Sequence, residues 1–246
     1  MTAFVLVHGA FRGGWAWRQV RPHLVAAGHD VHAPSLIGAG EHHERVREVT
    51  GLKTWSDQVS RLILLEDLRE VVLVGHSQGG LVTSSVAARI PDRVACVVHL
   101  DAAVPAAGER AVDLGPTPSR LPERGTVVRA TPVPKDSGEY DEETARWVDA
   151  RLSASPVGPA LDAVPAVPAE VREVFAFCAR TPAGYPSTHT RARLEAQGRP
   201  FTVLDAGHDA PLSAPSLVAA LLLAQVPTQP DPHATSRPRP TMKGLR

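Results

Sequence analysis

Hydrophobic and polar positions alternate along the chain between short apolar runs and longer amphipathic stretches. Six short runs have the length and β-branched content typical of buried strands, at residues 3–7, 30–33, 71–74, 94–100, 174–178 and 201–204. Apolar residues at helical spacing separate them, at residues 15–27, 54–68, 81–88, 187–197 and 214–226. Strands that alternate with helices in this way predict an α/β fold with a mainly parallel sheet of about six strands and helices on both faces.

The alternation stops between residues 105 and 170. This interval holds ten of the chain's 23 prolines, and proline is unfavourable inside strands because it lacks a backbone N–H. We therefore expect an irregular insertion with short helices, the clearest at residues 141–152. The insertion would form a small lid, while residues 1–104 and 171–226 would form the core of a single domain.

Residues 71–80, with the sequence VVLVGHSQGG, place a serine where a buried strand turns sharply into a helix. Such a turn forces unusual dihedral angles on its central residue, and the residues two positions away on each side must lack bulk. Gly75 and Gly79 meet that requirement around Ser77. The G-x-S-x-G spacing in this context predicts that Ser77 is a nucleophile. The alternative is a glycine-rich connection that carries a serine without a function.

A serine hydroxyl is a weak nucleophile near neutral pH, so Ser77 needs a base that takes its proton. His208 follows the last predicted strand through a turn of small residues, which can bring its imidazole over the carboxyl edge of the sheet. The alternative for His208 is a histidine on a surface loop. Two other histidines are interpreted as structural, since His76 faces away from the serine along the backbone and His8 braces its own turn.

Attack on a carbonyl carbon creates an oxyanion that needs two preorganised N–H donors. One expected donor is the backbone N–H of Gln78, directly after the nucleophile. The other is the backbone N–H of Ala10, in the first glycine-rich loop. The side chains of these two residues need not contribute.

Four short segments together carry a resemblance to a known family: HGAF at residues 8–11, GWAW at 14–17, GHSQGG at 75–80 and GH at 207–208. They resemble the α/β-hydrolase superfamily, and more narrowly its small branch of plant methyl esterases, hydroxynitrile lyases and bacterial hydrolases. The likeness covers about residues 3–226. It implies an α/β-hydrolase fold, a Ser–His–acid triad, an oxyanion hole at Ala10 and Gln78, a substrate pocket roofed by the lid, and no cofactor.

The acid of the triad departs from the usual pattern of this superfamily. In most members it follows the penultimate strand, yet residues 175–186 contain no carboxylate. Asp101 ends the strand after the helix that follows the nucleophile, an alternative acid position that some lipases of the superfamily use, and we expect it to serve. The competing interpretation is a capping aspartate at a strand end. Asp205 and Asp209 lie too close to His208 in sequence to reach its far ring nitrogen easily.

Composition narrows the range of partners and cofactors. Lys plus Arg and Asp plus Glu both number 26, so the formal net charge is zero and no global field attracts nucleic acid or an anionic membrane. A small-molecule substrate fits this balance, and a homodimer is left open. The pair His42-His43 has no further ligands at suitable spacing, so no metal site is expected. Cys96 and Cys178 are expected to be reduced packing residues.

The ends of the chain bear on its location. The N-terminus lacks a basic region, and its apolar run is too short for a signal peptide. No stretch reaches the roughly 18 apolar residues needed to span a bilayer. A cytoplasmic location is therefore expected. The five prolines and four basic residues of segment 227–246 predict a disordered tail.

The leading hypothesis is a serine hydrolase that cleaves a carboxylic ester, or a lactone or thioester, through an acyl-Ser77 intermediate. The low aromatic content of 4% concentrates apolar contact in a few rings. Phe11 and Trp15 from the first loop, and Trp147 or Tyr140 from the lid, are the expected substrate contacts, with core packing as the alternative for each. These rings favour a small apolar or aromatic substrate.

Two other hypotheses compete with ester hydrolysis. A lyase, cyclase or carbon–carbon bond hydrolase would use the same serine and histidine without an acyl-enzyme. Cyanohydrin cleavage is disfavoured, because Asp209 and Gly9 stand where hydroxynitrile lyases of this branch carry a lysine and a hydroxylated residue. A binding protein without turnover is the third hypothesis, which the missing carboxylate after the penultimate strand keeps open.

Overall fold

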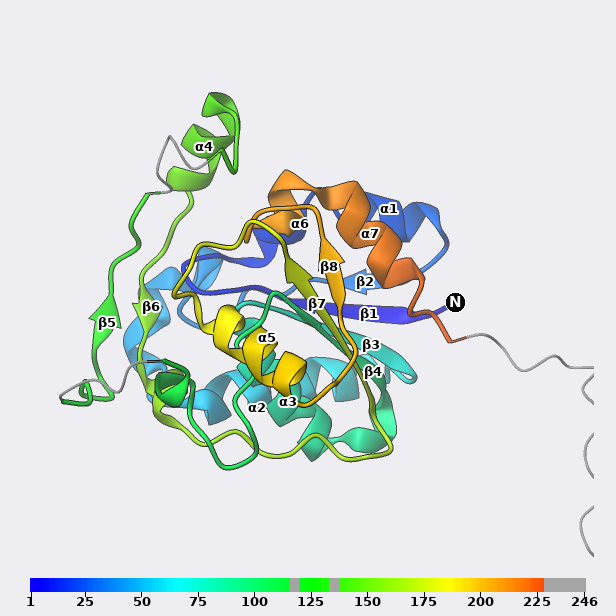
Figure 1. Cartoon of the computed structure of the whole chain (residues 1–246), viewed down its shortest axis with the longest axis horizontal. Helices are drawn as coiled ribbons and strands as arrows, with labels where there is room; N and C mark the ends of the chain where they lie inside the picture. The colour runs from blue at the N-terminus through cyan, green and yellow to red at the C-terminus, as the bar shows by residue number, and fades with distance from the viewer. Residues whose placement is uncertain (116–119, 133–137, 228–246) are drawn as a thin grey trace, which may run out of the picture.

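The computed structural model of the chain describes residues 1–115, 120–132 and 138–227. At its centre lies a six-stranded sheet in the order β2–β1–β3–β4–β7–β8, in which every pairing is parallel (Figure 1). Its strands are β1 (Ala3–Val7), β2 (Asp30–His32), β3 (Val71–His76), β4 (Val94–Leu100), β7 (Arg172–Cys178) and β8 (Thr202–Leu204). The mainly parallel sheet predicted from the apolar runs is confirmed.

Helices cover both faces of the sheet because successive strand residues point to opposite sides. In β1, Phe4 and Leu6 belong to one cluster of buried side chains, and Val5 and Val7 to another. The first cluster includes residues of α1 (Arg21–Ala26) and α7 (Pro215–Leu223), and the second includes residues of α2 (Leu52–Leu65) and α3 (Gly79–Arg89). α5 (Pro186–Ala196) packs against β7 through Leu194. Within the part of the chain described, no helix is long and apolar enough to cross a membrane.

One predicted helix is divided, and several short helices were not predicted. Residues 15–27 form a 3-10 helix, η1 (Gly14–Trp17), and then α1, because Pro22 at the start of α1 has no N–H with which to continue the preceding turn. The closing helix predicted at residues 214–226 is found as α7, and a separate short helix that was not predicted, α6 (Ala210–Ser213), precedes it. Two 3-10 helices were not predicted, namely η2 (Gly40–Glu48), between β2 and α2, and η3 (Pro91–Arg93), before β4.

Residues 105–170 are here called the inserted segment, and its described part forms an arm beside the carboxyl ends of the strands (Figure 1). Its helices η4 (Ala111–Asp113), α4 (Glu142–Asp149) and η6 (Gly158–Leu161) are short, as expected. It also contains an unpredicted antiparallel pair, β5 (Val127–Val128) and β6 (Ser155–Pro156), where Pro156 is tolerated because both strands are edges. The division into core and lid stays a prediction. The predicted tail lies outside the described residues beyond Pro227.

Candidate active site

Ser77 lies in the turn between β3 and α3 with a φ of 52°, in the left-handed region that is unfavourable for a residue with a side chain. Backbone hydrogen bonds to the neighbouring strand hold it there. The Ser77 N–H donates to the carbonyl of Leu100 at 3.1 Å, and the Ser77 carbonyl accepts from the N–H of Ala103 at 3.1 Å. A residue kept in such a conformation by its surroundings is typical of a functional site.

The sharpness of this turn depends on Gly75. A Cβ at this position would lie 2.6 Å from Thr83 Oγ1 and 2.7 Å from the carbonyl oxygen of Gly79. We expect Gly75→Ala to lower the free energy of unfolding by about 3 kcal/mol, since the backbone at Gly79 cannot give way without moving α3. Urea titration measures this loss. Gly125→Ala is the matched control, because nothing lies within 4 Å of a Cβ there, and a loss as large as that of Gly75→Ala would contradict the argument.

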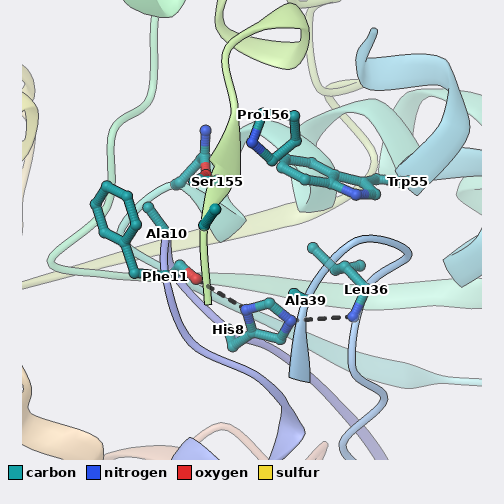
Figure 2. Close-up of a pocket in the computed structure, with 11 residues that line it drawn as sticks. His8, Ala10, Phe11, Leu36, Ala39, Trp55, Ser155 and Pro156 are labelled. Atoms are coloured by element: carbon teal, nitrogen blue, oxygen red, sulfur yellow. Dashed lines mark hydrogen bonds between the residues drawn. The ribbon is translucent and has the colours of Figure 1, made fainter. Parts of the chain in front are cut away.

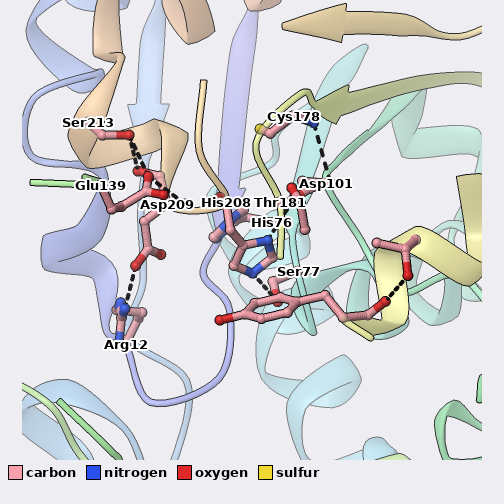
Figure 3. Close-up of polar contacts among 12 residues, drawn as sticks. Arg12, His76, Ser77, Asp101, Glu139, Cys178, Thr181, His208, Asp209 and Ser213 are labelled. Atoms are coloured by element: carbon pink, nitrogen blue, oxygen red, sulfur yellow. Dashed lines mark hydrogen bonds and ion pairs between the residues drawn. The ribbon is translucent and has the colours of Figure 1, made fainter. Parts of the chain in front are cut away.

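His208 connects Ser77 to Asp101 by two hydrogen bonds (Figure 3). Its Nε2 lies 3.0 Å from Ser77 Oγ, and its Nδ1 lies 2.6 Å from Asp101 Oδ2. An ionised carboxylate only accepts, so Nδ1 carries a proton and Nε2 is left to accept the serine hydroxyl. The structure thus brings together the three residues singled out as nucleophile, base and acid. The Asp101 side chain is 1% exposed and that of His208 is 14% exposed.

The carboxylate of Asp101 is held by the loop that lacks a carboxylate of its own. The hydroxyl of Thr181 donates to Asp101 Oδ2, and the N–H of Cys178 donates to Oδ1 at 3.4 Å. Burial opposes ionisation of Asp101, but the hydrogen bonds from His208 and Thr181 outweigh it and hold the pKa of this carboxyl below its usual value. Sequence reasoning missed Thr181. The only indication of Thr181 in the sequence is a hydroxyl within residues 175–186, the segment that supplies the acid in most of the superfamily.

The ring of His76 lies against the ring of His208. The ring centroids of His76 and His208 are 4.9 Å apart, and His76 Nε2 lies 2.8 Å from the carbonyl oxygen of His208. A carbonyl only accepts, so Nε2 carries the proton of His76. Burial, and next the neighbouring His208, lower the pKa of His76 to about 4. The neutral imidazole therefore fixes the backbone of the base, a structural role that touches the site.

His8 orients the peptide group in front of Ala10. The N–H of Leu36 donates to His8 Nε2 at 3.0 Å, so the proton of His8 is on Nδ1, which donates to the carbonyl of Gly9 at 2.8 Å (Figure 2). Burial lowers the pKa of His8 to about 4, which keeps this arrangement near neutral pH. In a trans peptide the C=O and the following N–H point in opposite directions. The N–H of Ala10 is therefore turned away from His8.

Ala10 and Gln78 line the same small cavity, whose volume is about 10 Å³, room for one water-sized group. The side chains around it are mostly apolar (Figure 2), with Phe11, Leu36, Ala39, Trp55 and Pro156 among them. Two other predicted substrate contacts lie elsewhere. Trp15 and Trp147 meet edge to face at 5.3 Å and pack with Tyr140 where the inserted segment joins the core. A substrate contact by either ring stays a prediction.

Among the described residues, no three His, Cys, Asp or Glu side chains are grouped so that they could hold a metal ion. Of the histidine pair considered from the sequence, His43 lies in η2 and donates from Nδ1 to the carbonyl of Gly40 at 3.1 Å. Cys96 and Cys178 are both free and buried.

The chain matches one protein family and is similar to several known proteins. A family model described as alpha/beta hydrolase fold matches residues 2–169. The carbendazim hydrolyzing esterase of Nocardioides sp. (strain SG-4G) is 42% identical over 116 residues, which cover 47% of this chain and 48% of that protein. Salicylic acid-binding protein 2 of Nicotiana tabacum is 40% identical over 106 residues, 42% of this chain and 40% of that protein. These matches span less than half of each relative's length.

Solved structures resemble almost the whole chain at lower sequence identity. An extracellular alpha/beta-hydrolase from a Paenibacillus species superposes with a TM-score of 0.74 at 20% identity, over 91% of this chain and 98% of that one. The methylesterase MES16 from Arabidopsis gives a TM-score of 0.71 at 22% identity, with the same coverage of 91% and 98%. At this identity the likeness shows the fold alone.

Proposed function

The chain belongs to the α/β-hydrolase fold family, close to the plant methylesterases and bacterial esterases, and we propose that it hydrolyses a carboxylic ester through an acyl-Ser77 intermediate. The observation that carries the proposal is the hydrogen-bonded series from Ser77 through His208 to Asp101, with distances of 3.0 and 2.6 Å. The bacterial relative described above is itself an esterase by name, which supports the reaction class.

In the proposed acylation step, Ser77 Oγ attacks the carbonyl carbon of the ester. His208 Nε2 takes the hydroxyl proton as the bond forms, and the positive charge that develops on the imidazole is stabilised by Asp101 at Nδ1. The same proton then passes to the departing alkoxide, which leaves as an alcohol. Because Nδ1 is already bonded to Asp101, the ring starts in the required tautomer and orientation.

The carbonyl oxygen becomes negative in the tetrahedral intermediate, and the backbone N–H groups of Ala10 and Gln78 are the proposed donors to it. The bond from His8 to the Gly9 carbonyl supports this role, since it fixes the plane of the peptide that contains the Ala10 N–H. Preorganised donors stabilise the developing charge without reorganising during the reaction. In the second half-reaction, water gives a proton to His208 Nε2 and attacks the acyl carbon, and the proton then returns to Ser77 Oγ as the bond between the serine and the acyl group breaks and the acid leaves.

The proposed substrate is an ester of a small apolar or aromatic molecule. The cavity beside Ala10 and Gln78 would take a small apolar group of that molecule, which its lining by Phe11, Leu36 and Trp55 favours. The inserted segment is proposed to be the lid, since its strand β6 contributes Ser155 and Pro156 to the same cavity. Lactones and thioesters share the acyl chemistry and belong to the same proposal.

Stopped-flow hydrolysis of p-nitrophenyl acetate tests the proposal. We expect a rapid release of p-nitrophenol that approaches one equivalent per protein, followed by slower turnover, because acylation precedes the attack of water. A fluorophosphonate should label one serine, located at Ser77 by peptide mass mapping. Labelling without a burst would favour lyase, cyclase or carbon–carbon chemistry. A folded protein that neither reacts with the probe nor releases product would overturn the proposal in favour of a binding function.

A further inference from the structure

Arg12 and Asp209 form an ion pair between two loops of the candidate site (Figure 3). Arg12 lies two residues after Ala10, and Asp209 directly follows His208. The guanidinium donates to Asp209 Oδ2, and the side chains are only 10% and 11% exposed. A φ of 65° at Phe11 turns the chain immediately before Arg12. The pair therefore connects the loop of one proposed oxyanion donor to the loop of the proposed base.

No other Lys or Arg ion pair in the described ranges is buried at both partners. In each of the others, at least one of the two side chains is 35% exposed or more. In the pair of Arg180 with Asp205, for example, the exposed fractions are 61% and 88%. Removing two charges from water is costly, and apolar residues of similar size often stabilise a protein as well or better. A gain in net stability therefore explains poorly why Arg12 and Asp209 are buried as an ion pair. A better explanation is that the pair holds the two loops in a fixed relative position.

The inserted segment contacts the same two loops. Glu139 Oε1 accepts hydrogen bonds from the N–H of Asp209 at 3.1 Å and from Ser213 Oγ at 2.7 Å. Farther along the segment, the N–H of Ser153 donates to the carbonyl of Phe11 at 3.1 Å. Each loop is thus held both by the ion pair and by hydrogen bonds to the inserted segment. These contacts together fix the position of the loop.

We infer that Arg12 is a positioning residue that acts through Asp209 to set where His208 stands relative to the oxyanion donor at Ala10. The inference rests on the proposed ester hydrolysis. The guanidinium has five N–H donors in a rigid planar fork, so it fixes direction as well as distance. A base or a donor displaced by about 1 Å costs on the order of 100-fold in rate even when the substrate still binds.

The charge of the pair offers a second readout. Burial disfavours the charge of Asp209, but Arg12, followed by His76 and His208, lowers the pKa of Asp209 to about 2. Without Arg12, an unpaired carboxylate would stand beside the base and stabilise its protonated form. The acid limb of the pH profile would then move to higher pH. The other titratable groups around the pair and His208 include Glu139, Tyr140, Tyr185, His76, Cys178 and Asp101.

Kinetics of three variants on p-nitrophenyl acetate test the inference. We expect Arg12→Gln to lower kcat about 100-fold with KM changed less than about threefold, and to raise the midpoint of the acid limb by about half a pH unit or more. Arg12→Lys keeps the charge without the fork, so its kcat should fall about tenfold with the limb unmoved. Arg180→Gln removes the exposed pair with Asp205 near the same loop, and should stay within about twofold of wild type.

The outcomes separate this inference from the proposed function. If wild type neither releases p-nitrophenol from the ester nor reacts with the fluorophosphonate, the proposed function fails and the inference fails with it. If wild type turns over while Arg12→Gln matches it in kcat and in pH profile, only the inference is overturned. Equal losses in Arg12→Gln and Arg12→Lys with no movement of the acid limb would also overturn it, as evidence of a merely structural role. Should Arg12→Gln fail to fold, Arg12→Lys decides, because wild-type kcat in that variant contradicts the inference.

Discussion

Replacement of Ser77 by alanine lowers turnover of p-nitrophenyl acetate by at least about 10⁴-fold and removes the burst of p-nitrophenol. The reason is chemical, since no oxygen remains 3.0 Å from His208 Nε2 to attack the ester. The remaining rate reflects the proposed oxyanion donors and substrate binding, which a water molecule can still exploit. Initial rates across a series of activated esters measure the loss, with circular dichroism to establish that the variant is folded.

Ser84→Ala provides the matched control for that experiment. Ser84 lies within α3, the helix that follows the turn, and its hydroxyl donates to the carbonyl of Gly80 at 2.9 Å. Loss of that bond leaves the triad untouched, so we expect a rate within about threefold of wild type. If Ser77→Ala kept more than a tenth of the wild-type rate, Ser77 would not be the nucleophile, and the acyl mechanism proposed for it would be wrong.

Replacement of Asp101 by asparagine lowers kcat by about 10⁴-fold with the fold retained. Both carboxylate oxygens accept hydrogen bonds, Oδ1 from Cys178 N–H and Oδ2 from Thr181 and His208. An amide nitrogen therefore faces a donor in either orientation. Turned toward His208, it stabilises the tautomer with the proton on Nε2, which cannot take a proton from Ser77.

Asp205→Asn is the comparison for that variant. Asp205 precedes His208 by three residues, pairs with Arg180 and has a side chain that is 88% exposed. Its rate should lie within about twofold of wild type, because an exposed pair contributes little. Thermal unfolding of both variants checks the fold. Near-wild-type turnover by Asp101→Asn would remove Asp101 from the triad and direct the search to another acid.

The sharp turn at Ser77 could be predicted because its determinants are local. Gly75 and Gly79 stand beside Ser77 in sequence, and each faces a close backbone or side-chain contact that only glycine accommodates. The position of Asp101 also follows from local order, once β4 is placed next to β3. In that register His76 pairs with Leu100, so the residues after each strand emerge side by side.

The supporting contacts could not be predicted because they join residues far apart in sequence. Thr181 is 80 residues from Asp101, and Arg12 is 197 residues from Asp209. A sequence pattern reports which face of a strand is buried, but not which loops meet beyond its end. The short pair β5 and β6 could not be predicted for another reason, since a strand of two residues shows almost no alternation of apolar and polar positions.

The contact between Glu139 and Gly207 bears on how this protein could be re-engineered. A Cβ on residue 207 would occupy the space of the Glu139 carboxylate, which also bonds to the backbone of Asp209. A chimaera that borrows the inserted segment of a relative, in order to change substrate range, must therefore keep a glycine at position 207 wherever position 139 keeps its carboxylate. A larger residue at position 207 would push that carboxylate out of its place and remove its hydrogen bond to the turn that carries His208.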